Sequence, residues 1–191
     1  ALPICAAAAD GVIHTAFIHD FSRFAASAQI DAAAIEAMAA TLAGSDKPFV
    51  VTSGTLGLPS GRVGTEADMP SPTGARRSET AALAAAAIGV RAIIVRLPPS
   101  VHGDGDRGFV PALIARAREQ GAVTTIGDGS NRWPAVHRLD AARLFRLALE
   151  QGTASARFHG VADEGIPVRE IAAVIGRRLG VPVVSKSVDE A

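Results

Sequence analysis

The sequence contains no tyrosine and only one cysteine, Cys5, among its 191 residues. A single cysteine excludes an internal disulfide and any zinc site built from several cysteines. Lysine and arginine number 19, as do aspartate and glutamate, so the chain lacks the basic surplus of a nucleic-acid-binding surface. No apolar run approaches the roughly 18 residues that span a bilayer. We therefore expect neither a nucleic acid nor a membrane as partner.

Hydrophobic residues make up 48% of the chain, which is too large a share for a disordered protein. The length suits one domain, or one and a half, with a real core. Periodicity predicts strands that alternate with helices of about 12 residues, and a loop over 57–74 rich in glycine and proline. The expected strands cover 11–17, 48–53, 90–96, 123–126, 157–161 and 181–184; the expected helices cover 31–42, 76–88, 109–120, 140–149 and 168–179.

The early strands are continuously apolar, as strands buried on both faces are. Together with the alternation of strands and helices, this predicts an α/β fold with a mostly parallel sheet. Such sheets bind ligands at the carboxyl ends of their strands. Those ends are expected at 15–17, 53–55 and 97–105.

Four segments in this order carry a family resemblance. They read VIHTAF at 12–17, VVTSGT at 50–55, VRLPPSVHGDG at 95–105 and WPAVHRLD at 133–140. Each is similar to one segment of a single superfamily. The first resembles the fourth strand, and the second resembles the strand that ends in the catalytic Ser/Thr. The third resembles the "LRP…VYGPG" segment and the fourth the "VHVDDLA" segment. The chain thus resembles the extended and atypical short-chain dehydrogenase/reductases, the NAD-dependent epimerase/dehydratases.

The resemblance implies a partial doubly wound, Rossmann-type parallel sheet with a small C-terminal α/β portion on the substrate side. A partial dinucleotide-binding domain would consist of residues 1–107 and of 136–162, where the chain returns to it. The substrate-side portion would consist of 108–135 and 163–191. The resemblance further implies NAD or NADP as cofactor, a small-molecule substrate, a cytoplasmic location and a possible homodimer through helices 31–42 and 76–88.

The family's Gly-rich phosphate-binding turn is missing, since no G-x-G-x-x-G or G-x-x-G-x-x-G precedes Gly11. We therefore expect the chain to be a segment of a longer one, with the outer side of strand 12–17 left as an unpaired edge. Residues 103–108 do fit G-x-G-x-x-G formally. They follow two prolines rather than a strand, and Asp104 and Asp106 would repel a pyrophosphate, so we do not interpret them as the fingerprint.

The family's catalytic pair is missing as well. Its acid/base tyrosine, and the lysine four residues later, would fall near Ser71 and Ala75, neither of which can act in that way. Ser53 occupies the position whose hydroxyl binds the substrate oxygen; alternatively it satisfies a backbone group at the strand end. His102 replaces the tyrosine of "VYG" and is either a proton donor or a packing residue. The sequence around Ser53 is not the G-x-S-x-G of a hydrolase nucleophile.

Other positions take their roles from the resemblance or from their neighbours. Arg76 either binds a phosphate or carboxylate or begins a solvated helix, and Trp133 either lines a substrate pocket or packs. His14 is interpreted as a hydrogen-bonded core histidine, and no metal site is expected, because His14 and His19 lack a third ligand. The cofactor-binding candidates are Thr15, Ala16, Phe17, Thr52, Pro98, Pro99, Ser100 and Val101; the substrate-binding candidates are Thr55, Arg76, Asn131, Arg132 and Trp133.

Two functions remain open from the sequence. The first is an NAD(P)-dependent oxidoreductase or epimerase/dehydratase-like protein that acts on an unknown small molecule. The second is a non-catalytic nucleotide-sensing or interaction domain that has kept the fold and lost the chemistry. The absence of tyrosine favours the second, whereas the retained Ser53 and the strand-end loops favour a binding pocket in either case.

Overall fold

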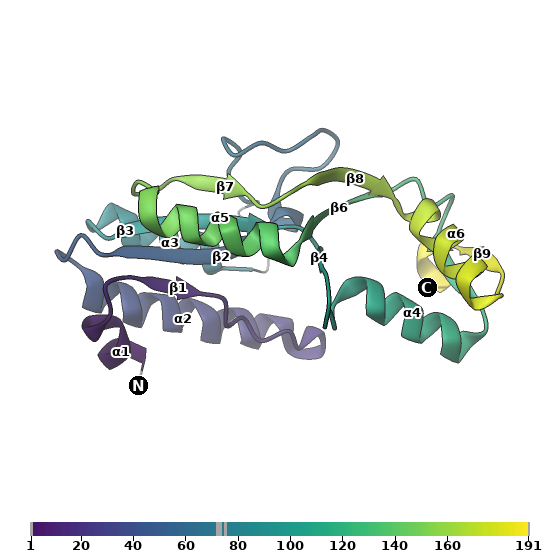
Figure 1. Cartoon of the computed structure of the whole chain (residues 1–191), viewed down its shortest axis with the longest axis horizontal. Coiled ribbons are helices and arrows are strands. Elements are labelled where there is room, and N and C mark those ends of the chain that lie inside the picture. The colour runs from purple at the N-terminus through teal and green to yellow at the C-terminus, as the bar shows by residue number, and fades with distance from the viewer. Residues whose placement is uncertain (1, 72–73, 75, 191) are drawn as a thin grey trace. The chain divides into compact units, whose positions relative to one another are not determined.

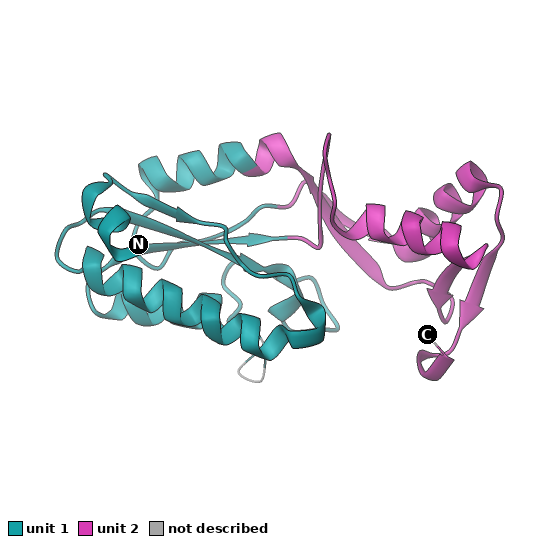
Figure 2. Cartoon of the chain, turned by 90° about the horizontal axis from the view of Figure 1, so that it is seen from below, with its two compact units in different colours: residues 1–97, 142–160 teal, residues 98–141, 161–191 magenta. Residues whose placement is uncertain are grey.

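The computed structural model describes residues 2–71, 74 and 76–190 (Figure 1). The chain divides into two compact units, one of residues 1–97 and 142–160 and the other of 98–141 and 161–191 (Figure 2). The first boundary lies at Leu97, ten residues before the expected one, because the next strand pairs within the second unit. The assignment of a cofactor role to one part and a substrate role to the other stays a prediction.

The first unit contains a parallel sheet in the order β1-β2-β3-β7. Its strands are β1 (Val12–His14), β2 (Pro48–Gly54), β3 (Arg91–Leu97) and β7 (Arg157–His159). The predicted α/β class with a mostly parallel sheet is confirmed. β1 is shorter than the expected strand over 11–17, because its pairing with β2 ends where His14 faces Val51. It lies at the end of the strand order, and Ile13 is 41% exposed.

Helices cover both faces of this sheet, which explains its continuously apolar strands. On one face, α1 (Leu2–Ala8), α2 (Phe24–Leu42) and α3 (Ser78–Ala87) pack on β2 and β3 around Phe49, Val51, Ala92 and Ile94. On the other face, α5 (Arg138–Gln151) places Phe145 and Ala148 against Val50, Ile93 and Val95. Residues at even and odd positions of β2 therefore face different helices.

One α-helix was not predicted, and two others begin earlier than predicted. α1 was not expected, because Leu2–Ala8 is short, with no acidic residue in its first turn and no basic residue in its last. α2 begins at Phe24, seven residues before the expected start, after a short helix η1 (Phe21–Arg23) that Asp20 caps. α5 begins at Arg138, two residues before the expected start, so Asp140 lies in its first turn.

The second unit is built from shorter strands. β4 (Ser100–His102) pairs in parallel with β6 (Arg132–His137), which pairs antiparallel with β8 (Asp163–Pro167). β5 (Val123–Ile126) and β9 (Val183–Lys186) form a separate parallel pair. α4 (Phe109–Gln120) and α6 (Val168–Leu179) pack with β5 around Ala117, Val123, Ala172 and Ile175. Gly121 and Gly180, in left-handed backbone conformation, end these helices as expected.

Two further short helices complete the secondary structure: η2 (Thr55–Gly57) follows β2 directly, and η3 (Val188–Glu190) follows β9. Within the described part of the chain, no helix has the length and apolar character needed to cross a membrane.

Candidate functional site

Ser53 lies one residue before the end of β2, at the carboxyl edge of the parallel sheet. The residue is 6% exposed, and its hydroxyl has no hydrogen-bond partner among the residues that the structure describes. The alternative role, satisfying a backbone group at the strand end, therefore finds no support. A nearly buried hydroxyl without a partner is available to a ligand oxygen.

Next to β2, a chain of polar contacts joins β1, α2 and α3. His14 Nε2 lies 2.7 Å from Asp31 Oδ1, and the Ser78 hydroxyl donates to Asp31 Oδ2 at 2.5 Å. Arg76 continues the chain, because its Nε donates to Ser78 Oγ at 3.0 Å and its Nη2 to the Thr52 carbonyl at 3.2 Å. His14 is thus the hydrogen-bonded core histidine that the sequence indicated.

Arg76 is half-buried and does not begin a solvated helix, since α3 starts only at Ser78. Its guanidinium carbon lies 4.2 Å from the centre of the Phe17 ring. Burial lowers the pKa of Arg76, and the nearby Asp31 opposes that effect. The alternative that it contacts a ligand anion stays a prediction.

Asp31 is almost completely buried. Burial alone would raise the pKa of its carboxyl group, but the hydrogen bonds from His14 and Ser78, together with the charge of Arg76, lower it below the ordinary aspartate value. The group therefore stabilises the fold as a carboxylate above the pKa of the unfolded chain, and this contribution is lost as the pH falls toward the folded-state pKa.

We expect Asp31→Asn to lower the free energy of unfolding by about 1–3 kcal/mol at neutral pH, because the substitution weakens a buried charged hydrogen-bond network. The difference from the unsubstituted chain should shrink below about pH 4. Urea unfolding at several pH values measures both effects. Asp10→Asn, at an exposed aspartate, is the matched control and should show neither. A difference that stays constant down to acid pH would contradict the assignment.

A second polar cluster surrounds Arg96, whose side chain is fully buried in β3 (0% exposed). Its Nε and Nη2 donate to the two carboxylate oxygens of Glu79 at 2.9 and 2.6 Å. Its Nη1 lies 3.2 Å from the Thr65 carbonyl and 3.1 Å from His159 Nε2, and Nη2 donates to the Asp68 carbonyl at 2.6 Å. These five contacts match the five N–H donors of a guanidinium group.

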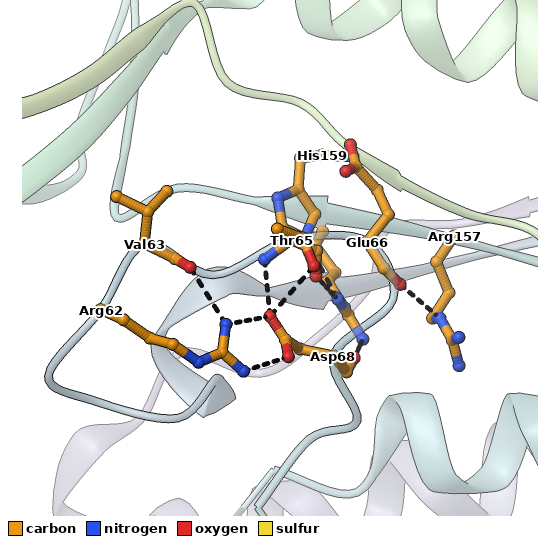
Figure 3. Close-up of polar contacts among 8 residues, drawn as sticks. Arg62, Val63, Thr65, Glu66, Asp68, Arg157 and His159 are labelled. Carbon is orange, nitrogen blue, oxygen red and sulfur yellow. Dashed lines mark hydrogen bonds and ion pairs between the residues drawn. The ribbon is translucent and has the colours of Figure 1, made fainter.

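The loop over 58–71 is held in the first unit by these contacts and by others shown in Figure 3. Arg62 pairs with Asp68, whose carboxylate also accepts the Thr65 N–H. Arg157 Nε donates to the Glu66 carbonyl at 2.8 Å. The loop that the sequence identified only by its glycines and prolines is therefore fixed to β3 and β7.

His159 Nε2 accepts a hydrogen bond from Arg96 Nη1, because an arginine side chain can only donate. Burial lowers the pKa of His159 most strongly; Glu66 opposes this shift, and the charge of Arg96 adds to it. The imidazole therefore acts as an acceptor inside the cluster and not as a second cation beside Arg96.

The second unit contains a pocket of about 650 Å³. Every residue that lines it belongs to this unit, and the lining includes Ser100, His102, Asp104, Phe109 and Trp133. The rings of Phe109 and Trp133 are stacked, with centroids 4.1 Å apart and planes 4° from parallel. Trp133 thus packs on Phe109 and also lines a pocket, and its contact with a substrate stays a prediction. His102 also lines it and meets His137 edge to face, with ring centroids 5.5 Å apart.

The G-x-G-x-x-G run at 103–108 lies in this pocket wall, and one ground for rejecting it was wrong. The run follows strand β4 directly and precedes helix α4, as a fingerprint would. The other ground stands, because the run carries Asp104 and Asp106, and Asp106 Oδ1 already accepts the Gly108 N–H at 2.7 Å. That carboxylate lies next to the helix end where a phosphate would bind, and its charge opposes one there.

The remaining candidates lie in varied surroundings. Thr15 and Ala16 are exposed in the segment after β1, whereas Phe17 is buried and packs on Phe24. Thr52 Oγ1 donates to the His14 carbonyl at 2.7 Å. Their roles toward a cofactor or substrate stay predictions, as do those of half-buried Thr55, Pro99 and Val101, buried Pro98 and Ser100, and exposed Asn131 and Arg132.

Of the two positions matched to the family's tyrosine and lysine, the structure describes only Ser71. The Ser71 N–H donates to the Gly57 carbonyl at 2.8 Å, within the long loop. Ala75 lies outside the described residues.

The sequence interpretation missed Asp31, Glu79 and Arg96. A charged residue within an otherwise apolar strand, as Arg96 is in RAIIVRL, was the one signal that pointed to a buried partner. The two carboxylates gave no comparable signal, because both stand in alanine-rich helices.

Comparison with known proteins shows a family similarity over part of the chain. Residues 75–159 match the model of the NAD dependent epimerase/dehydratase family. An uncharacterized protein of Schizosaccharomyces pombe is 52% identical over 185 residues, and one of Saccharomyces cerevisiae is 48% identical over the same length. The match covers 95% of the chain in both cases, but only 63% and 62% of these relatives, so the chain spans less than two thirds of their length.

A more distant relative has a stated activity. A 2-alkyl-3-oxoalkanoate reductase of Stenotrophomonas maltophilia is 33% identical over 102 residues, which cover 51% of this chain and 31% of the reductase.

Solved structures share the fold. A dTDP-glucose 4,6-dehydratase from Streptomyces venezuelae, with NAD bound, superposes with a TM-score of 0.77 at 19% identity, over 97% of this chain and 64% of that one. MoeE5 in complex with UDP-glucose and NAD gives 0.77 at 21% identity, over 97% and 68%. The Rossmann-like sheet, the matched segment and these relatives agree with the resemblance drawn from the motifs: over residues 75–159 the chain is similar to the NAD-dependent epimerase/dehydratase family.

Proposed function

We propose that this chain is part of an NAD(P)-dependent oxidoreductase or epimerase/dehydratase-like enzyme that acts on a small molecule. The observation that carries the proposal is the unpartnered, nearly buried Ser53 hydroxyl at the carboxyl edge of a parallel sheet, in a chain similar to this family. The reductase at 33% identity supports chemistry at a carbonyl group.

The first unit fits part of a dinucleotide site. Thr15 and Ala16 are exposed immediately after β1, where an adenosine or ribose would be held, and Ser53 is free to bind a reacting oxygen. NAD(P), when bound, supplies the hydride donor or acceptor that such chemistry needs. No Gly-rich turn for its phosphates precedes Gly11.

Three residues of the chain have separate roles in the proposed reaction. The Ser53 hydroxyl donates to the substrate oxygen and orients the carbon that reacts. His102, in the second unit, is the candidate for the proton-donor role of the family's tyrosine. Arg76, fixed by Ser78 and Thr52, keeps a positive charge beside the carboxyl end of β2.

The second candidate function is a non-catalytic nucleotide-sensing or interaction domain. The complete absence of tyrosine favours it, since the family's usual acid/base residue has no equivalent in this sequence. Such a domain would bind a nucleotide without turning over any substrate.

The test that separates the two uses the full-length protein encoded by the gene. We expect it to bind NADH or NADPH in a fluorescence titration and to oxidise the bound cofactor in the presence of at least one carbonyl compound from a broad panel. Binding without turnover, unchanged by Ser53→Ala, would establish the sensing function instead. Failure to bind either cofactor would refute both.

Residues 1–191 alone should bind NAD(H) or NADP(H) weakly, with a dissociation constant above about 100 μM, because the pyrophosphate cradle is missing from this sequence. Isothermal titration calorimetry measures this directly. Binding in the low micromolar range would contradict the prediction and would mean that the 103–108 run or the segment after Phe17 holds phosphate after all.

A further inference from the structure

The pocket in the second unit has the wrong charge for a phosphorylated ligand. Among the described residues that line it, none is a lysine or an arginine, whereas Asp104 and Asp106 both contribute carboxylates. Phosphate groups in proteins are normally met by arginine, lysine or a free helix N-terminus. A nucleoside diphosphate would bring further negative charge to a wall that is already negative.

The N-terminus of α4 is a lining feature that could attract an anion, but a carboxylate lies beside it. Asp106 Oδ1 accepts the N–H of Gly108, the residue immediately before the helix, at 2.7 Å. Pro111, in the first turn, has no N–H to offer. A phosphate at this helix end would therefore meet the negative charge of Asp106.

The other walls of the pocket are apolar and aromatic. Val110, Pro134, Ile166 and Ile171 line it together with the stacked rings of Phe109 and Trp133. Both rings are only partly buried, so each keeps surface that a ligand can cover. Such walls favour an apolar or ring-containing molecule.

The Ser100 side chain brings a polar group to the pocket. Ser100 is 8% exposed and lines the pocket, yet its hydroxyl makes no hydrogen bond to any other described residue. His102, two residues later on β4, lines the same pocket. Together they can donate to a hydroxyl or carbonyl oxygen of a ligand.

We propose that this pocket binds an uncharged, largely apolar carbonyl compound or alcohol, held by Ser100 at an oxygen and by Phe109 and Trp133 at its body, and that it rejects nucleoside diphosphates. The inference goes beyond the proposed function and does not depend on it, because the binding requires neither the cofactor nor Ser53.

Trp133 makes the proposal directly measurable. It is the only tryptophan of the chain, and the chain has no tyrosine, so intrinsic fluorescence reports on this pocket alone. Residues 1–191 would be titrated with cyclohexanone, menthone and camphor as neutral ketones and with UDP and UDP-glucose as nucleoside diphosphates. N-acetyltryptophanamide, titrated in parallel, corrects for collisional quenching.

We expect a saturable response to at least one ketone, with a dissociation constant at least about tenfold lower than that of either nucleotide. Ser100→Ala should weaken ketone binding about fivefold through loss of one hydrogen bond, and Phe109→Ala should weaken it by about tenfold or more. Asp104→Lys should strengthen UDP binding about threefold or more and leave ketone binding within about twofold. Glu119→Lys, the same charge change in the last turn of α4, is the matched control and should alter neither.

Two results would overturn the proposal: tighter binding of UDP than of every ketone, or the absence of a saturable response to any ketone. Both would leave the proposed function open, because the cofactor assays on the full-length protein do not depend on Trp133. Conversely, if a ketone binds here and those assays fail, the proposed enzyme function is refuted and the ketone-binding pocket is supported.

Discussion

Replacing Arg96 by methionine is expected to lower the free energy of unfolding by about 3–5 kcal/mol, the largest stability effect of any substitution considered for this chain. The substitution removes five hydrogen bonds at once and leaves the Glu79 carboxylate buried without its cation. The carbonyls of Thr65 and Asp68 lose their donors as well. The 58–71 loop should therefore detach while the sheet is still folded.

Urea unfolding and limited trypsin digestion measure the two consequences. Cleavage after Arg62, in the 58–71 loop, should become faster in Arg96→Met under conditions where the sheet remains folded. The double variant Arg96→Met/Glu79→Leu should recover most of the lost stability, because it removes the unpaired charge, but should leave the loop sensitive. Recovery of the loop's resistance in the double variant would mean that Arg96 does not hold it.

Ser53→Ala is expected to lower kcat/KM of the full-length protein about 10²–10³-fold once a substrate is in hand, because the proposed function makes this hydroxyl the donor to the oxygen on which charge develops. The same substitution should leave the stability unchanged or slightly raised, since the buried hydroxyl has no partner among the described residues to lose. Enzyme kinetics and thermal unfolding on one preparation give both values.

Ser45→Ala provides the opposite pattern as a control. Its hydroxyl donates to the Leu42 carbonyl at 2.6 Å, at the end of α2, so its loss should lower stability by about 1 kcal/mol and leave the kinetics unchanged. Ser53→Thr, which keeps a hydroxyl, should retain most of the activity. A stability loss in Ser53→Ala without a kinetic defect would restore the purely structural interpretation of this residue.

The sequence was most informative for strands with continuous apolar runs and for helices that end at a glycine. β2, β3, α4 and α6 were predicted to within one residue at each end, because continuous apolar runs and clear glycine stops leave few alternatives. The strands β4, β6 and β8 were not predicted as strands. β8 reads DEGIP, and such short, mixed segments become strands only through their partners in the sheet.

In the candidate site, the sequence predicted residues at strand ends and turns but not the buried carboxylates. Ser53 and Trp133 followed from motifs that mark strand ends and turns, which local sequence specifies. Asp31 and Glu79 did not, because a carboxylate in an alanine-rich helix is ordinarily solvated, and only the register of α2 and α3 on the sheet places these two inside. Tertiary packing, not local pattern, decides which charges are buried.

The two units are interleaved along the chain, and this has a consequence for synthesis. β3 ends at Leu97 but receives its outer neighbour only with β7 (Arg157–His159), and β5 receives its partner only with β9 (Val183–Lys186). On the ribosome, β1, β2 and β3 with α2 and α3 can assemble early from nearby segments, whereas each unit stays incomplete until a strand made roughly 60 residues later emerges. A nascent chain stalled before Val183 would therefore carry a finished first unit joined to a second one whose strand β5 still exposes its pairing edge to chaperones and to other chains.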